Sequence, residues 1–260
     1  GASTGDMLVD NQDTLDAIFR EAPVNIVTHC EDTPTIIENE KAIIAKYGED
    51  LDATFHPAIR SAEACLKSSQ LAYDLATKHG SNLHILHLTT ADEMKLFTEG
   101  DITGKKITAE VCVHHLFFSE AAYKTHGNLI KCNPSVKSEQ DRLALIDAVQ
   151  INKIDIIATD HAPHTWEEKQ QPYLQAPSGL PLNQHSLLVL LDFYSKGIFS
   201  LEQIVQKTSH NIAERFQIKD RGYIREGGYA DLVVIDLSSN TLVTKENILY
   251  HCGWSPFLDY

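Results

Sequence analysis

The stretch Ile154-Asp-Ile-Ile-Ala-Thr-Asp160-His-Ala-Pro-His164 decides the fold. A β-branched apolar run stops abruptly at an acid and two histidines, which predicts a buried strand with ionisable groups at its carboxyl end. Three earlier runs have the same texture, and we expect them to be strands of the same sheet. They are Val24–His29, Leu83–Leu88 and Ile107–Cys112.

Segments with apolar residues at intervals of three and four separate these runs, as expected of helices that cover a parallel sheet. Ser138 and Thr90 are each followed by acids within one turn, which predicts a helix N-terminus at both. The alternation of strands and helices therefore predicts an α/β fold built from βα units. The expected helices are Pro34–Tyr47, Ser61–His79, Ala91–Thr98, Ser138–Asn152, Asn183–Ser195 and Leu201–Phe216.

Two segments depart from this alternation. Pro163–Leu182 contains four prolines and has no clear period, so we expect a long loop over a strand end, where loops of this length tend to be functional. Gly227-Gly-Tyr-Ala-Asp-Leu-Val-Val-Ile-Asp236 reads as a glycine turn feeding a strand without a following helix. This change of texture predicts a small β appendage from about Gly222 onward.

Composition excludes some classes of function. The 260 residues are 43% hydrophobic and carry a formal charge of −14, from 36 acidic and 22 basic residues. This charge repels nucleic acid and anionic membranes, and the chain lacks the roughly 20 consecutive apolar residues of a membrane span. The five cysteines are scattered singly, which indicates neither a zinc ribbon nor a disulfide framework and fits a reducing cytoplasm.

Three metal-binding residue types lie at predicted strand ends: His29, His87 and Asp160. In a β/α barrel the carboxyl ends of the strands meet at one mouth, so residues far apart in sequence come together there. Imidazole nitrogens and a carboxylate are ligands that catalytic zinc prefers. A packed histidine is the alternative for each position alone, but three together favour a metal site. Strand alternation places His84 on the opposite face from His87.

At this point the motifs resemble those of dihydroorotase, a member of the amidohydrolase superfamily. The resemblance rests on His29-Cys-Glu-Asp, His84-Ile-Leu-His-Leu-Thr-Thr, Asn133-Pro-Ser and Ala158-Thr-Asp-His-Ala-Pro-His. It implies the C-terminal part of a metal-dependent hydrolase (β/α)8 TIM-like barrel over residues 1–221, incomplete at its N-terminus. It also implies part of a small β-sandwich domain over residues 222–260.

The resemblance further implies a function and a site. One or two zinc ions would serve the interconversion of N-carbamoyl-L-aspartate and L-dihydroorotate, a small-molecule reaction of pyrimidine biosynthesis. Asp160 would act as the catalytic proton carrier, and Glu110 with His114-His115 would support or pack against the site. The implied metal ligands are His29, His87 and Asp160, and the implied substrate contacts are Asn133, His164, Ser178 and Gly179.

The chain also departs from the family pattern. Gly1-Ala-Ser-Thr-Gly5 resembles the segment just after the family's metal-bridging residue, so the first-strand His-x-His pair is missing, and the C-terminus stops before the last β-domain strands. Two alternatives stay open: a dihydropyrimidinase, hydantoinase or allantoinase, and a catalytically inactive fragment or scaffold homologue. An unpaired sheet edge would need covering by another chain, and a homo-oligomer is compatible with this.

Overall fold

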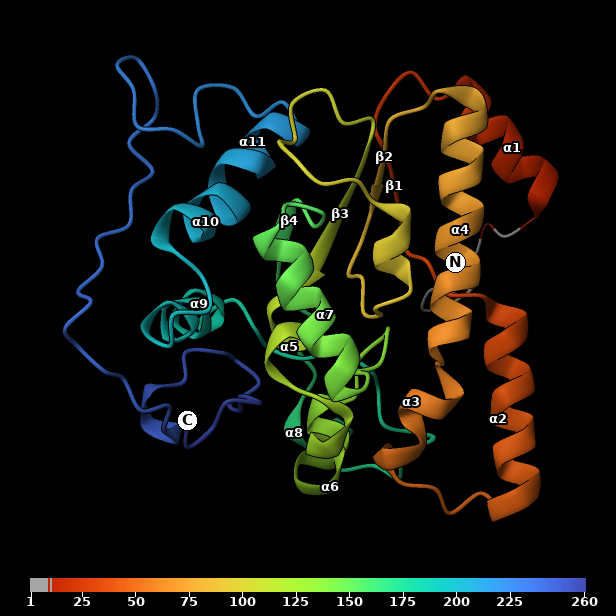
Figure 1. Cartoon of the computed structure of the whole chain (residues 1–260). Helices are drawn as coiled ribbons and strands as arrows, with labels where there is room; N and C mark the ends of the chain where they lie inside the picture. Colours follow the sequence, from red (N-terminus) through yellow and green to blue (C-terminus); the bar gives the residue numbers. More distant parts are fainter. Residues whose placement is uncertain (1–8, 10) are drawn as a thin grey trace.

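Four parallel strands form the centre of the computed structural model, which describes residues 9 and 11–260 (Figure 1). The sheet order follows the sequence, with each strand pairing only with its neighbours in the chain. All four lie inside the predicted runs, so the α/β prediction is confirmed. The strands are β1 (Ile26–Thr28), β2 (Leu83–Ile85), β3 (Ile107–Cys112) and β4 (Ile156–Ala158).

The burial of the strands explains why their sequences are nearly continuous apolar runs. Every residue of β2 is buried, and β3 is buried from Thr108 to Cys112. Parallel strands with helices packed around them have no solvent face, so polar alternation is absent. β1 is the exception, because Val27 is 45% exposed.

Helices cover the sheet, with α4 beside β1 and β2 and with α10 and α11 toward β4, while α2 packs against α3 and α4 (Figure 1). The long helices are α1 (Gln12–Glu21), α2 (Thr33–Tyr47), α4 (Ala62–His79), α7 (Glu139–Gln150) and α9 (Ser186–Ser195). The short ones are α3 (His56–Ile59), α5 (Val113–Phe117), α6 (Tyr123–His126), α8 (Trp166–Lys169), α10 (Leu201–Val205) and α11 (Asn211–Arg215). Single turns are η1 (Ala53–Phe55), η2 (Glu93–Leu96), η3 (Glu120–Ala122), η4 (Gly127–Ile130), η6 (Lys245–Asn247) and the π-helical η5 (Gln206–His210).

Polar caps set several helix starts. The Ser138 hydroxyl accepts a hydrogen bond from the Asp141 amide at 3.1 Å and begins α7, as predicted. Thr90 and Glu93 exchange the expected reciprocal bonds, but only the short 3₁₀ turn η2 follows, in place of the predicted helix over Ala91–Thr98. The Glu93 carboxylate is buried against Ser69 and Thr90, which ties this turn down at its start.

The predicted strand over Gly227–Asp236 does not form. Within residues 222–260, all of which the structure describes, the only regular element is η6, and the chain runs as extended coil outside α9 and α10 (Figure 1). A strand needs a partner for its backbone groups, and none lies beside this segment. Val234 is consequently 98% exposed. The expected division into residues 1–221 and 222–260 stays a prediction.

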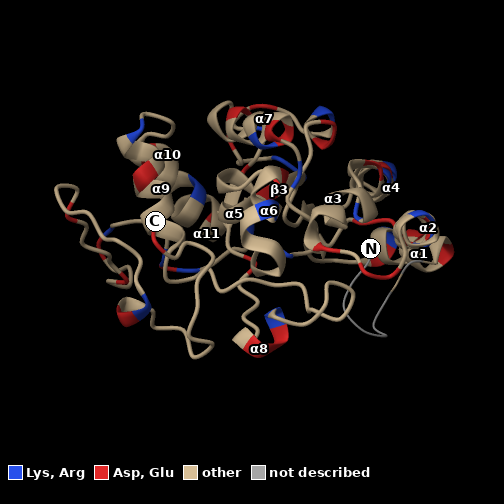
Figure 2. Ribbon diagram, turned by 90° about the horizontal axis from the view of Figure 1, so that it is seen from below, with Lys and Arg blue, Asp and Glu red and all other residues tan. Residues whose placement is uncertain are grey.

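Acidic and basic residues alternate along the outer helices, for example along α2 and α7 (Figure 2). In the part of the chain that the structure describes, no helix combines the length and the apolar character needed to cross a membrane. Gly1–Gly5, the segment expected to follow a metal-bridging residue, lies outside the described residues.

Candidate active site at the carboxyl ends of the strands

His29 and His87 meet at the carboxyl end of the sheet. His29 follows β1 directly, and His87 lies two residues after β2, where its φ of +38° turns the chain out of the strand direction. The Nδ1 atom of His29 and the Nε2 atom of His87 are 2.7 Å apart. Two imidazoles separated by 58 positions in the sequence thus point their nitrogens at one spot.

The two histidines differ in their surroundings. His87 is only 3% exposed, whereas His29 keeps contact with solvent. Burial, together with the nearby positive charges of His29 and His115, lowers the pKa of His87 well below its usual value of 6.5. His87 is therefore a neutral imidazole at physiological pH, and its buried Nδ1 has no hydrogen-bond partner.

Asp160 follows β4 and faces the same mouth. Its φ of +48° is unusual for a residue other than glycine, and such strain tends to occur at functional positions. Partial desolvation raises the pKa of the Asp160 carboxyl group, while the charge of His29 opposes this rise and that of Glu110 adds to it. Among the described residues, His29, His87 and Asp160 do not form a group whose ligand atoms all lie within 4.8 Å of one another, so the structure pairs the two histidines but does not bring the Asp160 carboxylate up to both.

The loop after β4 carries the other predicted residues. His164 Nε2 lies 3.1 Å from the carbonyl oxygen of Ser178, and the Gly179 amide donates to the carbonyl of Lys131 at 2.9 Å. Asn133 stands two residues after Lys131, and its buried Oδ1 has no partner. The structure thus brings His164, Ser178 and Gly179 together and links them through the Lys131 backbone to Asn133.

Two buried lysines hold this loop in place. Lys169 Nζ donates to the carbonyls of Lys131, Pro177 and Gly179 at 2.9–3.1 Å. Lys131 Nζ donates to the carbonyls of Tyr173 and Ala176 at 2.6 Å. An ammonium group has three donors, so every donor of Lys169 has a hydrogen-bond acceptor. These bonds hold a loop that has little regular secondary structure of its own.

Sequence reasoning missed two polar pairs beneath the site. Glu31 is 2% exposed and pairs with the guanidinium of Arg60. His84 is fully buried, and its Nε2 lies 3.1 Å from a carboxylate oxygen of Glu110. The negative charge of Glu110 also raises the pKa of Asp160. The other ring nitrogen of His84 lies 2.8 Å from the Thr108 hydroxyl, and its predicted position on the opposite face from His87 stays a prediction.

These residues suit a divalent metal. His29 and His87 already converge on one point, and a carboxylate is the third donor that zinc commonly takes. Nδ1 of His87 is buried and has no hydrogen-bond partner, and leaving a buried polar atom unpaired lowers the stability of the fold. The donor set therefore fits the group that the sequence motifs imply.

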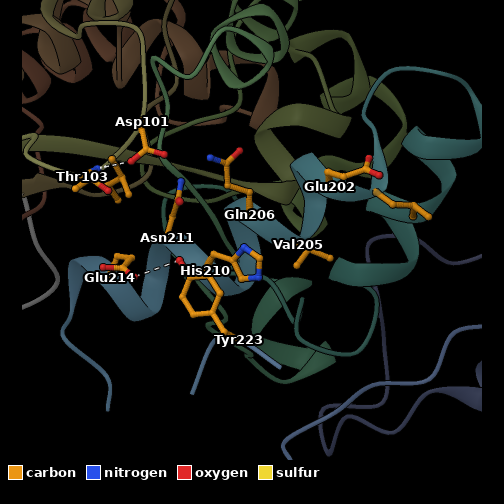
Figure 3. Close-up of a pocket in the computed structure, with 11 residues that line it drawn as sticks. Asp101, Thr103, Glu202, Val205, Gln206, His210, Asn211, Glu214 and Tyr223 are labelled. Carbon is orange, nitrogen blue, oxygen red and sulfur yellow. Dashed lines mark hydrogen bonds between the residues drawn. The ribbon is translucent and has the colours of Figure 1, made fainter. Parts of the chain in front are cut away.

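A separate hollow lies at the other end of the sheet, beside the Asp101–Thr103 segment that leads toward β3 (Figure 3). Its lining includes the π-helical turn η5, and Tyr223 stacks on His210 with ring centroids 4.1 Å apart. The Tyr223 hydroxyl donates to Glu214 at 3.2 Å. These polar groups satisfy one another, so the hollow offers no comparable arrangement of ligands.

The parallel α/β sheet, with an imidazole pair at the carboxyl ends of its strands, is typical of barrel hydrolases. The comparison with known families agrees, because residues 8–251 match the amidohydrolase family. The chain belongs to the amidohydrolase family.

Curated relatives include enzymes named dihydroorotase. One from Staphylococcus aureus is 32% identical over 272 aligned residues, which cover 100% of this chain and 59% of the relative. Another, from Halobacterium salinarum, is 33% identical and covers 98% of this chain and 58% of its own length. The chain thus spans less than two thirds of these relatives.

Solved structures share the fold. An L-hydantoinase (dihydropyrimidinase) from Arthrobacter aurescens superposes with a TM-score of 0.90 at 24% identity, covering 100% of this chain and 59% of the other. A dihydroorotase from Saccharomyces cerevisiae gives a TM-score of 0.55 at 19% identity, covering 61% and 44%. At these identities the likeness establishes the architecture alone.

Proposed function

We propose that this chain contributes the larger part of a zinc-dependent cyclic amidohydrolase that interconverts N-carbamoyl-L-aspartate and L-dihydroorotate. The observation that carries the proposal is the convergence of His29 and His87, with nitrogens 2.7 Å apart, at the carboxyl end of the sheet whose last strand leads to Asp160. The dihydroorotase names of the relatives at 32–33% identity support this substrate. The reaction would belong to pyrimidine biosynthesis, in the cytoplasm.

The residues of the chain have distinct tasks in this reaction. His29, His87 and Asp160 would hold zinc, which when bound supplies the Lewis acidity that makes water nucleophilic near neutral pH. Asp160 would take one proton of the attacking water and return it to the departing ring nitrogen as the amide bond breaks, while the other water proton leaves with ionisation of the new carboxyl group.

Substrate orientation would fall to the loop after β4 and to Asn133. The unpartnered Oδ1 of Asn133 can accept a hydrogen bond from a ring N–H, and His164 can donate to a carbonyl oxygen. The backbone at Ser178 and Gly179 would contact the ring edge. Lys169 would keep this wall of the pocket fixed through its bonds to Pro177 and Gly179.

The metal site is tested by replacing His29, His87 and Asp160 individually with alanine in the full-length protein. Each variant should lose most bound zinc by metal analysis and most dihydroorotate hydrolysis, because the remaining donors no longer complete a site. Lys41→Ala, on the exposed face of α2, is the control. Unchanged zinc content and turnover in all three variants would refute the assignment.

The substrate is tested by comparing turnover of dihydroorotate, dihydrouracil and allantoin. Preference for dihydroorotate supports the proposal, and preference for either of the others points to a dihydropyrimidinase or an allantoinase. A full-length protein that binds zinc but hydrolyses none of them would instead be a scaffold homologue. Sedimentation of the same preparation would test the homo-oligomer, and proteolysis near residue 222 would test the division into residues 1–221 and 222–260.

A further inference from the structure

A second group of potential metal ligands lies at the end of β3 and the start of α5. One ligand atom each from Cys112, His114 and His115 lies within 4.8 Å of the other two, and all three residues are buried. Cys112 and His114 have no exposed surface at all, and His115 is 2% exposed. The group is separate from His29, His87 and Asp160, which offer only nitrogen and oxygen.

The imidazoles of this group lack the partners that buried polar groups normally have. Neither ring nitrogen of His114 has a hydrogen-bond partner, and Nδ1 of His115 has none either. A neutral imidazole always presents one N–H donor and one lone pair, and buried groups of this kind are nearly always paired. Three buried imidazole nitrogens without partners in one cluster therefore indicate that the cluster binds a ligand.

Cys132 supplies a fourth donor from another segment. Its Sγ lies 3.7 Å from Nε2 of His115, and the residue is 2% exposed. Burial raises the pKa of the Cys112 thiol well above its usual value, and the negative charges of Glu110, Asp160 and Cys132 add to the effect. Burial raises the pKa of the Cys132 thiol as well, so both thiols stay protonated unless a cation binds beside them.

We propose that Cys112, His114, His115 and Cys132 bind a structural zinc ion. Two thiolates and two imidazoles form a closed tetrahedral set, with no position left for water. Zinc–ligand distances of about 2.0–2.3 Å place tetrahedral ligand atoms roughly 3.3–3.8 Å apart. The ligand atoms of Cys112, His114 and His115, which lie within 4.8 Å of one another, would draw closer on binding, and Cys132 would join them from the side of His115 Nε2. Binding releases the two thiol protons to solvent.

The hydrogen bonds around the cluster fit this site. His115 Nε2, the ring nitrogen that lies beside Cys132, is 3.1 Å from the carbonyl oxygen of Pro134 and would exchange this contact for the ion. The Cys132 thiol also donates to Pro134 at 3.1 Å and would give up this bond on ionising. The ion would fasten Cys132, and with it Asn133, to the end of β3.

Cobalt substitution tests the site without any assay of activity. The full-length protein is refolded with Co²⁺, and absorption in the near ultraviolet is recorded, because thiolate-to-cobalt charge transfer requires a cysteine ligand. We expect this band in the wild type and its loss in Cys112→Ser. Cys65→Ser is the matched control, since Cys65 is also fully buried but contacts Thr89 instead. Its band should stay.

Two further measurements separate loss of the metal site from loss of folding. His114→Gln keeps a polar side chain of similar size. Titration of the charge-transfer band should show Co²⁺ affinity at least tenfold weaker than in the wild type, while the circular dichroism spectrum stays native. X-ray absorption of the zinc-loaded wild type should show sulfur scatterers at about 2.3 Å. Absence of sulfur around zinc in the folded wild type, or a charge-transfer band that persists in Cys112→Ser, would overturn the proposal.

Discussion

His56 is fully buried between two hydrogen-bond partners. Its Nδ1 lies 2.8 Å from the Tyr173 hydroxyl and its Nε2 lies 2.7 Å from the carbonyl oxygen of Cys132. Burial lowers the pKa of His56 well below 6.5, with the charges of Arg60 and Lys131 acting in the same direction. The folded protein therefore keeps this side chain neutral at a pH where the unfolded chain already binds a proton.

This difference sets a pH dependence of stability. Because the folded pKa is below the unfolded one, the contribution of His56 is complete above about pH 6.5 and is lost as the pH falls toward the folded pKa. We expect the free energy of unfolding in urea to fall below pH 6.5, with His56 supplying up to about 1.4 kcal/mol per pH unit. His56→Gln should make that slope shallower, whereas His251→Gln, at an exposed position, should leave it unchanged. Equal slopes for His56→Gln and wild type would contradict this origin.

Gly179 has a backbone that no other residue adopts easily, with φ at +145°. A Cβ there would lie 2.4 Å from the carbonyl oxygen of Ala162, so both the conformation and the space exclude a side chain. Gly179→Ala should lower the free energy of unfolding by about 3 kcal/mol, from strain and overpacking together. Gly197→Ala is the control, because its φ is +69° but nothing lies within 4 Å, and it should cost only about 1 kcal/mol. Equal losses in the two variants would show that the contact with Ala162 is unimportant.

At the scale of elements, Lys169 at the end of α8 supports a loop that has little secondary structure of its own. Lys169→Met removes three hydrogen bonds and leaves the carbonyls of Lys131, Pro177 and Gly179 without this donor. We expect a loss of about 3 kcal/mol in stability and faster cleavage by chymotrypsin at Leu174, which is already 40% exposed. Lys41→Met, on exposed α2, should alter neither quantity. Wild-type cleavage rates in Lys169→Met would mean that the loop is held by other contacts.

The elements also show what local sequence can predict. Long apolar runs and helical periods identified β1 to β4 and the long helices α2, α4 and α7, because burial on both faces or on one stripe dictates those patterns. Ala91–Thr98 carries the same period but yields only η2, since its carboxylate at Glu93 is fixed by Ser69 from α4. Gly227–Asp236 has a strand sequence, yet a strand forms only where a partner lies beside it.

At the scale of the whole molecule, the approach of His29 to His87 could be predicted because the topology of a parallel sheet brings its carboxyl ends together, whereas a joint metal site with Asp160 stays a prediction. The thiol–imidazole cluster could not be predicted from spacing. Cys132 is distant from Cys112 in sequence, and only the packing of its segment against α5 brings it near His115. The role of Lys169 was hidden for the same reason, since a lysine in a polar loop gives no sign of burial.

The edge of the sheet formed by β1 has a measurable consequence for association. β1 pairs only with β2 among the described residues, and the exposed Val27 lies in the middle of this edge strand. Unpaired backbone groups beside an apolar side chain favour pairing with a second copy of the chain, although the formal charge of −14 opposes association at low salt. We therefore expect the 260-residue chain to dimerise with increasing concentration in sedimentation velocity, and more so at high salt.

Val27→Lys should abolish this association, because pairing of the edge would then desolvate an ammonium group. Val205→Lys is a closely matched control, since Val205 on α10 is also 45% exposed but lies away from the edge. It adds the same charge and should leave the dimer intact. If both variants weaken association equally, net charge rather than the β1 edge controls it. A wild type that stays monomeric at every concentration and salt would contradict pairing through the β1 edge.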